Sequence, residues 1–167
     1  SVRDIEIGDT ITLKDNPDDA TPIIAGNVSF YNESSNGAIP PSPIVSCLGR
    51  LKDVTKAVPM HFQTSDSILI MAGERRDELG GSVFYSLHDE LGANVPQPNL
   101  KEVKNQIFAL TDCINEGLVL SCHDIADGGV ASTLTEMTFG NGIGCDITID
   151  SDLLTDKILF SETGGFV

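Results

Sequence analysis

The stretch Leu118–Met137 constrains what this chain can fold into more than any other part of the sequence. It opens with the apolar run Leu118–Leu120 and then turns polar, which is the pattern of a buried strand that surfaces at its end. Beyond the polar segment, Val130, Leu134 and Met137 follow one another at spacings of four and three, which places them on one face of a helix. The stretch therefore predicts a strand, a tight loop and a helix.

The loop in this stretch holds two aspartates and a glycine pair. Asp124 and Asp127 are natural helix N-caps, because a short carboxylate accepts the N–H groups that the first turn leaves without partners. The pair Gly128–Gly129 lets a backbone segment or an anion approach the helix N-terminus closely. Another turn, Gly80–Ser82, also contains a glycine pair. For both turns, a purely structural role and the binding of an anion such as phosphate remain open.

His123 and the cysteines are the other candidates for chemistry. His123 lies between a cysteine and an aspartate, so it either ligates a metal or is a hydrogen-bonded structural residue at a strand end. The chain has four cysteines: Cys47, Cys113, Cys122 and Cys145. None forms a C-x-x-C pair, which disfavours zinc sites and thioredoxin-type chemistry. We therefore expect reduced thiols in the core of a cytoplasmic protein.

The charge of the chain excludes some partners. Lys and Arg total 10 against 25 Asp and Glu, and the formal net charge is −15. Such a chain repels nucleic acid and anionic membranes, so neither is expected as a partner. A phosphorylated ligand is still compatible, because a divalent cation and helix N-termini neutralise phosphate locally. The sequence has no apolar run of transmembrane length, which favours a soluble protein.

Polar residues interrupt an apolar strand pattern that starts at Thr21. Gly26 marks a bulge or a close approach of the backbone, Asn27 supplies an uncharged oxygen ligand, and Ser29 supplies a hydroxyl group. This pattern fits a ligand site, and it fits equally an edge strand with ordinary polar residues.

The remaining patterns of the first part are short. They predict two strands, one on either side of Gly8–Asp9, a loop at Asn16–Asp19, a turn or a mobile loop at Glu33–Gly37, an extended connector at Ile39–Pro43 and a strand at Ile44–Gly49.

The second part alternates strand and helix patterns. They predict a strand at Ser67–Gly73, a helix opened by Leu79–Ser82 that carries Val83, Leu87 and Leu91, a helix at Leu100–Ile114 that stops before Gly117, and strands at Cys145–Ile149, Ile158–Phe160 and Phe166–Val167. Together with the stretch Leu118–Met137, this order predicts an α/β fold with a mixed β-sheet and helices packed on it.

Several segments together resemble a known family, the second half of the large subunit of formylglycinamide ribonucleotide amidotransferase, also called phosphoribosylformylglycinamidine synthase II. The resemblance covers about residues 21 to 167, in order and in spacing. The segments that carry it are Gly26–Glu33, Ile39–Pro43, Leu79–Ser82, Ser121–Gly129 and Leu159–Glu162.

This resemblance implies an ATP-dependent ligase of purine biosynthesis that requires Mg²⁺. Its substrate is formylglycinamide ribonucleotide, and its ammonia comes from glutamine through a separate amidotransferase subunit and a small bridging subunit. At matching positions it implies that Gly26 contacts ATP, Asn27 coordinates Mg²⁺ and Ser29 contacts the substrate. It implies no catalytic residue in this chain, because the catalytic His of the family belongs to the first half of the subunit.

The resemblance also implies an architecture. Residues 1–58 correspond to part of an N-terminal lobe, which is compatible with a homodimer through that lobe, and residues 59–167 to a truncated C-terminal α/β domain of the aminoimidazole ribonucleotide synthetase-like type. We expect the fragment alone to be inactive. Two alternatives stay open: a related ATP-dependent enzyme (aminoimidazole ribonucleotide synthetase, selenophosphate synthetase or hydrogenase maturation factor), or a non-catalytic nucleotide-binding or assembly module.

Overall fold

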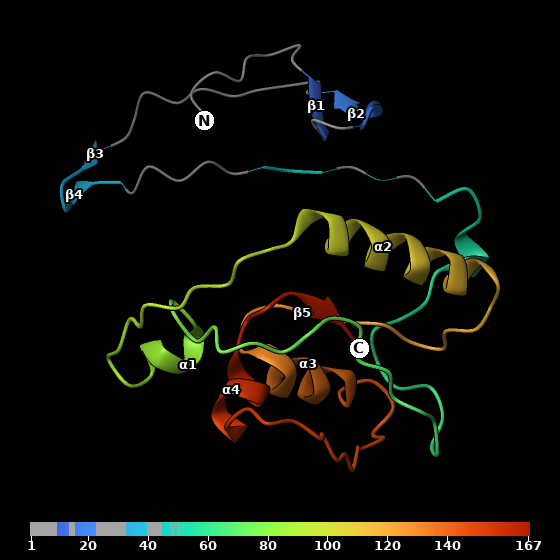
Figure 1. Ribbon diagram of the computed structural model, residues 1–167. Coiled ribbons are helices and arrows are strands. Elements are labelled where there is room, and N and C mark those ends of the chain that lie inside the picture. The colour runs from blue at the N-terminus through green and yellow to red at the C-terminus, as the bar shows by residue number, and fades with distance from the viewer. Residues whose placement is uncertain (1–9, 14–15, 23–32, 40–44, 48, 50) are drawn as a thin grey trace. The chain divides into compact units, whose positions relative to one another are not determined.

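The computed structural model describes residues 10–13, 16–22, 33–39, 45–47, 49 and 51–167 (Figure 1). The chain forms two compact units, residues 1–49 and residues 50–167, and each is described by itself.

The described part of the first unit consists of two short hairpins. Strand β1 (Thr10–Leu13) pairs antiparallel with β2 (Asn16–Pro22), and β3 (Glu33–Ser34) pairs antiparallel with β4 (Gly37–Ala38). The Ser34 hydroxyl closes the second hairpin, because it donates to the Gly37 carbonyl at 3.3 Å and accepts the Asn36 N–H at 3.2 Å. The predicted turn at Glu33–Gly37 is thus confirmed.

Two other predictions for this unit are wrong. The predicted loop at Asn16–Asp19 belongs to β2, whose first residue, Asn16, pairs with Leu13 at the end of β1. The described residues of the predicted strand Ile44–Gly49 carry no regular structure and are exposed, so no partner strand fixes them. The first strand of the hairpin predicted around Gly8–Asp9 lies outside the described residues.

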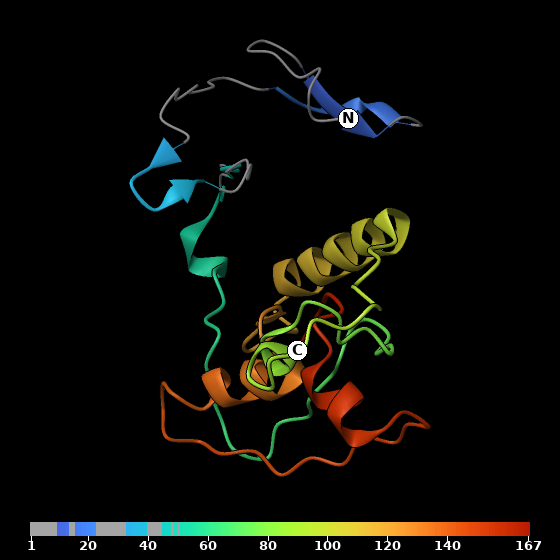
Figure 2. The same ribbon diagram turned by 90° about the vertical axis from the view of Figure 1, so that its left-hand side faces the viewer.

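The second unit contains the helices. Its elements in chain order are the 3₁₀ turn η2 (Val54–Lys56), α1 (Val83–Ser86), α2 (Leu100–Asn115), β5 (Asp124–Ile125), α3 (Gly129–Met137), α4 (Thr155–Phe160) and β6 (Gly165–Phe166). In both views of Figures 1 and 2, α3 lies between α2 and the long segment that joins α3 to α4. The expected α/β character is confirmed. No helix among the described residues is both long enough and apolar enough to cross a membrane.

Helix α2 has local signals at both ends. The Asn99 side chain accepts the N–H groups of Lys101 and Glu102 and so caps the first turn. Beyond the last turn Gly117 has a φ of +73°, a conformation that glycine adopts without strain. The predicted helix and its stop are confirmed.

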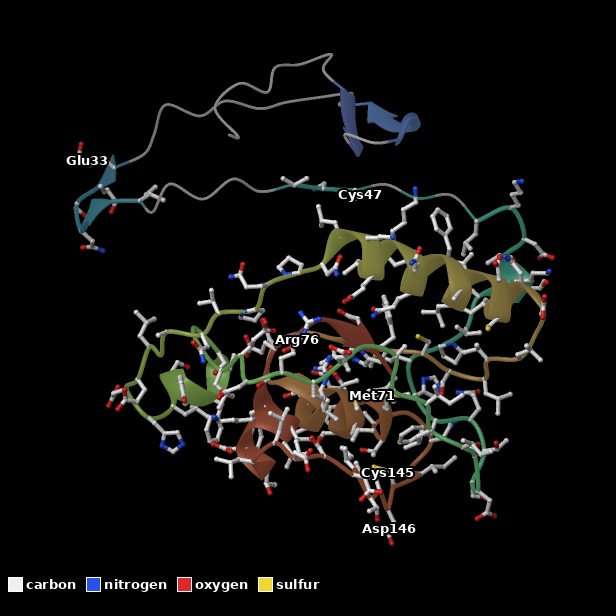
Figure 3. The ribbon with its side chains drawn as sticks, in the orientation of Figure 1. Glu33, Cys47, Met71, Arg76, Cys145 and Asp146 are labelled. Carbon is white, nitrogen blue, oxygen red and sulfur yellow. The ribbon has the colours of Figure 1, made fainter. Side chains whose placement is uncertain are left out.

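Helix α3 supplies the core of the second unit. Its buried side chains Val130, Leu134 and Met137 pack with Phe62 and Ile125. Half-buried apolar side chains surround this cluster: Leu69, Met71, Ile143, Ile149 and Val167. Met71 is labelled in Figure 3. Complete burial of one such aliphatic side chain stabilises a fold by about 1.5–3 kcal/mol, so the predicted stripe accounts for much of the stability of this unit.

Strand β6 is the centre of a small antiparallel sheet. On one side it pairs with β5, where Asp124 lies opposite Phe166 and Ile125 lies opposite Gly165. On the other side Phe166 forms an antiparallel bridge with Ala72. The strand predicted at the end of the chain is therefore confirmed, and it pairs on both of its edges.

Four predicted strands differ from the structure. The strand predicted at Leu118–Leu120 is absent, and β5 begins only at Asp124, directly after His123, whose backbone pairs with Val167. Of Ser67–Gly73, only Ala72 is paired, and Cys145–Ile149 has no regular structure. The predicted strand Ile158–Phe160 is the end of α4, because a short apolar run fits a helical turn as well as a strand.

The helix predicted from Val83 to Leu91 is one turn long. It ends at Ser86, and Leu87 and Leu91 are each 77% exposed, so the predicted apolar stripe has nothing to pack against within the described residues. Asp89 has a φ of +57°, so the backbone at this position is not helical.

The four thiols are free, as predicted, but they do not all lie in the core. Cys47 and Cys145 are exposed, whereas Cys113 and Cys122 are half-buried. Cys145 and Asp146 lie in the segment between α3 and α4 (Figure 3). Their apolar neighbours in the sequence do not form the strand that would have buried the Cys145 thiol.

Candidate functional site

The three residues predicted to bind ligands lie outside the described residues. Gly26, Asn27 and Ser29 belong to the range 23–32, so their roles remain predictions. In the part of the chain that the structure describes, no group of three or more His, Cys, Asp or Glu side chains could hold a metal ion.

The described residues that correspond to motifs of the sequence meet around Glu162. Its Oε1 atom accepts the N–H of Val83 at 2.8 Å and the N–H of Gly128 at 2.9 Å. The Val83 N–H belongs to the first residue of α1, directly after the turn Gly80–Ser82, and the Gly128 N–H belongs to the N-cap of α3 within the pair Gly128–Gly129. One carboxylate oxygen thus holds two helix N-termini together, and we call this arrangement the Glu162 junction.

The neighbours of Glu162 anchor the same loops. Ser161 is fully buried, and its Oγ accepts the N–H of Glu78 at 3.4 Å. The Thr163 hydroxyl donates to Oε2 of Glu78 at 2.8 Å, and Oε1 of Glu78 accepts the N–H of Gln97 at 3.2 Å. Three consecutive side chains therefore tie the segment after α4 to the two loops that precede α1 and α3.

The pair Gly128–Gly129 is needed for packing. Gly129 has a φ of +66°, and a Cβ atom there would lie 2.6 Å from the Leu159 carbonyl oxygen and 2.8 Å from that of Ser161. The end of α4 thus passes directly over the start of α3. Because the Glu162 carboxylate already occupies the anion position at this N-terminus, the structure favours the structural role of Gly128–Gly129 over phosphate binding.

The glycines of the turn Gly80–Ser82 are likewise explained by packing. A Cβ atom on Gly80 would lie 2.7 Å from the Asn94 carbonyl oxygen, to which the Gly80 N–H donates at 2.7 Å. Ser82 follows as a buried N-cap, since its Oγ accepts the Tyr85 N–H at 3.2 Å and donates to the Leu79 carbonyl at 2.6 Å. The predicted helix start at Gly80–Ser82 is confirmed.

The predicted capping of α3 by an aspartate is wrong. The N-cap of α3 is Gly128, which has no side chain to accept a hydrogen bond, and Asp124 lies in β5. Glu162 takes the capping role from a distant part of the chain. Local sequence could not reveal this partner, although the segment Leu159–Glu162 was among those that carried the family resemblance.

His123 is a hydrogen-bonded residue with both ring nitrogens engaged. Nε2 lies 2.8 Å from Oε2 of Glu136, and Nδ1 lies 3.2 Å from Oδ1 of Asp124. Its side chain is 15% exposed. The structural interpretation is therefore the better one. Burial, together with the charge of Asp124, raises the pKa of the neighbouring Cys122 thiol, which disfavours a reactive thiolate there.

Arg75 has a role that the sequence did not indicate. Its Nη2 donates to the Gly164 carbonyl at 3.0 Å, whereas Nε and Nη1 are buried without a hydrogen-bond partner. Burial lowers the pKa of Arg75, and the nearby charge of Glu78 opposes this shift. The guanidinium group thus stabilises the turn before β6, close in sequence to Glu162. The neighbouring Arg76 points elsewhere, since it pairs with Glu102 at 3.3 Å (Figure 3).

A small cavity lies beside the turn Gly80–Ser82. Its volume is about 110 Å³, and its walls include Asp77, Leu79, Gly80, Tyr85, Gly92, Ala93 and Asn94. Ligand pockets usually measure about 300–1,000 Å³, so this cavity fits a few water molecules and not a nucleotide. In chemical terms, the described residues form a scaffold around two glycine turns.

Comparison with known proteins identifies relatives of this scaffold. Residues 64–167 match the family described as AIR synthase related protein, C-terminal domain. The chain is also similar to several proteins named phosphoribosylformylglycinamidine synthase subunit PurL. It is 41% identical to that of Methanothrix thermoacetophila over 158 residues, which cover 93% of this chain and 21% of the relative.

Two further relatives carry the same name. The protein of Alkaliphilus metalliredigens is 37% identical over 147 residues, and that of Moorella thermoacetica is 38% identical over 144 residues. Each match covers 86% of this chain and 20% of the relative. The chain thus spans about a fifth of the length of these curated relatives, and the resemblance indicated by its motifs is confirmed.

Proposed function

From the premise that the chain belongs to the AIR synthase related protein family, we propose that it is part of an ATP-dependent ligase of purine biosynthesis. The full-length protein would convert formylglycinamide ribonucleotide, ATP and ammonia to formylglycinamidine ribonucleotide, ADP and phosphate. One observation carries this proposal: 41% identity to a phosphoribosylformylglycinamidine synthase subunit over 93% of the chain.

In this proposal Gly26 lies against ATP, Asn27 is a ligand of Mg²⁺ and Ser29 contacts the ribonucleotide. The residue types support these roles. An amide oxygen is a common ligand of hard cations, and glycine permits a close approach of the backbone to phosphates. ATP would supply the phosphoryl group that converts the amide oxygen of the substrate into a leaving group.

We propose that residues 1–58 belong to an N-terminal lobe and residues 59–167 to a C-terminal domain. The start of the second compact unit at Arg50 and the start of the family match at residue 64 support a boundary in this region. The relatives are named as subunits, which supports an assembly with other chains. We propose a glutamine amidotransferase subunit and a small bridging subunit as partners in the cytoplasm, and a homodimer through the N-terminal lobe.

An activity assay tests the reaction. Full-length protein is incubated with ATP, Mg²⁺, ammonium and formylglycinamide ribonucleotide, and phosphate and the amidine product are measured. We expect phosphate release that depends on this ribonucleotide. Release with aminoimidazole precursors or with selenide instead would assign the protein to a related enzyme of the same architecture.

Calorimetry tests the site residues. The variant Asn27→Ala should weaken binding of Mg²⁺-ATP at least tenfold, which corresponds to about 1.4 kcal/mol, because it removes an oxygen ligand of the metal. Asn36→Ala is the matched control, since Asn36 lies in the exposed turn between β3 and β4. Equal binding by both variants would remove Asn27 from the site.

A non-catalytic nucleotide-binding module is the second candidate. It is supported by the resemblance, which implies no catalytic residue in this chain. Binding of Mg²⁺-ATP by the full-length protein without turnover of the ribonucleotide would select this function.

A further inference from the structure

The sequence contains two Asn–Gly pairs, Asn36–Gly37 and Asn141–Gly142. An asparagine before a glycine is chemically labile, because the glycine nitrogen attacks the side-chain amide carbon and no Cβ atom on the glycine hinders the approach. The two pairs have the same local chemistry. A difference in their reactivity therefore comes from the structure around them.

Asn36 lies at the tip of the β3–β4 hairpin (Figure 1). The whole range 33–39 is exposed, and a Cβ atom on Gly37 would meet no atom within 4 Å. The backbone N–H of Asn36 donates to the Ser34 hydroxyl at 3.2 Å, but its side-chain amide has no hydrogen-bond partner among the described residues. The amide carbon Cγ of Asn36 is therefore free to turn toward the Gly37 nitrogen.

The hairpin offers little resistance to this attack. Strands β3 and β4 form two residue pairs, one of which joins Ser34 to Gly37, and no third strand adds to them in the part of the chain that the structure describes. An isolated hairpin of two strands is marginally stable, so it opens locally and releases the Gly37 N–H from its pairing. Each opening lets the backbone at Asn36 adopt the geometry that ring closure needs.

Asn141 has a different environment. Its Nδ2 atom donates to the Phe62 carbonyl at 2.9 Å, and Phe62 is a buried member of the core cluster. The Phe62 N–H donates in turn to the Met137 carbonyl at the end of α3, also at 2.9 Å. Attack on the Asn141 side chain must first break its bond to this anchored carbonyl. Ring closure is therefore slower here, although Gly142 is exposed like Gly37.

We propose that Asn36 is a site of spontaneous modification, at which the chain deamidates to aspartate and isoaspartate. The Gly37 nitrogen loses its proton and bonds to Cγ of Asn36. The bond between Cγ and Nδ2 breaks, and Nδ2 takes up a proton through water and leaves as ammonia. One water molecule then opens the cyclic imide. Opening at Cγ gives aspartate, and opening at the backbone carbonyl carbon gives isoaspartate.

The modification changes both the charge and the backbone of the hairpin. Either product adds a negative charge to a chain whose formal net charge is already −15. Isoaspartate also leads the main chain through the side chain and so adds a backbone atom to the turn between β3 and β4. This displaces Gly37 from Ser34 and breaks the hydrogen bond from the Ser34 hydroxyl to the Gly37 carbonyl, which measures 3.3 Å. The inference does not depend on the proposed enzymatic activity.

Peptide mapping by mass spectrometry tests the proposal. The full-length protein is aged in mildly alkaline buffer, folded in one sample and unfolded in concentrated urea in another, and deamidation at Asn36 and Asn141 is followed over time. In urea we expect similar rates at the two sites, because neither is held by structure. In the folded protein we expect Asn36 to react at least tenfold faster than Asn141. A smaller difference, or an Asn36 that stays intact, would overturn the proposal.

Two substitutions give an independent readout. Asn36→Gln keeps the amide but lengthens the side chain by a methylene group, so attack by Gly37 must close a less favourable six-membered ring. We expect release of ammonia at position 36 to fall at least tenfold, and an unchanged rate would overturn the proposal. Asn141→Gln is the matched control and should leave the reaction of Asn36 unchanged. If this control does not fold, the comparison of Asn36 with Asn141 in the unmodified protein still decides.

Discussion

At the scale of single residues, Glu162 caps the N-terminus of α3, a role that the sequence pattern assigned to Asp124 and Asp127. A carboxylate near a helix N-terminus is favoured by the partial positive charge there, and this one serves two helices at once. The glycine turns that resembled anion sites therefore already contain an anion, which the chain itself supplies.

Replacement of this carboxylate tests its role. Glu162→Gln keeps a hydrogen-bond acceptor but removes the charge, so we expect a loss of about 1 kcal/mol in the free energy of unfolding. Glu162→Ala leaves the N–H groups of Val83 and Gly128 without their partner and should cost about 2–4 kcal/mol. Urea unfolding measures both losses. Glu90→Gln, at an exposed position, is the control; losses no larger than in this control would show that the junction contributes nothing.

At the scale of elements, the approach of α4 to α3 depends on one glycine. Gly129→Ala puts a Cβ atom 2.6 Å from the Leu159 carbonyl oxygen and a side chain at a φ of +66°. Gly142→Ala is a matched control with the same φ of +66° and no atom within 4 Å of the added Cβ. We expect about 1 kcal/mol of destabilisation in the control, from the left-handed backbone alone, and clearly more at Gly129. Equal midpoints in urea unfolding would contradict the close approach.

Elements with local signals were predictable from the sequence. Helix α2 has a capping Asn99, an apolar stripe and a stop at Gly117, all within its own segment. The apolar stripe of α3 likewise predicted the core. These features depend on neighbours three or four positions away, which a single sequence displays directly.

Elements defined by distant partners were not predictable. The strand expected at Leu118–Leu120 has no paired neighbour, whereas Asp124 is paired because Phe166 lies opposite. The N-terminus of α3 is capped across 34 positions of sequence by Glu162. The hydrogen bond of Arg75 to the Gly164 carbonyl is of the same kind, at a separation of 89 positions. Such pairs arise from the fold and leave no periodic pattern in the sequence.

At the scale of the whole molecule, the excess of acidic residues opposes folding. Only 10 Lys and Arg face 25 Asp and Glu, and the resulting charge of −15 is concentrated when the chain becomes compact. In the described part of the chain, cations are used in specific pairs, such as Arg76 with Glu102 and Lys157 with Asp77. Exposed pairs of this kind add little stability, typically about 0–1 kcal/mol, so repulsion among the remaining carboxylates should dominate the response to salt.

Salt should therefore stabilise this chain. Raising NaCl from about 0.01 M to about 0.15 M shortens the Debye length from about 30 Å to about 8 Å, which screens repulsion across the molecule more than it weakens contacts at hydrogen-bond distance. We expect the melting temperature of the chain to rise by a few degrees in a thermal scan. MgCl₂ at matched ionic strength is the control, since a larger rise with Mg²⁺ would indicate specific binding of the cation. A melting temperature that falls with NaCl would show that the ion pairs outweigh the repulsion.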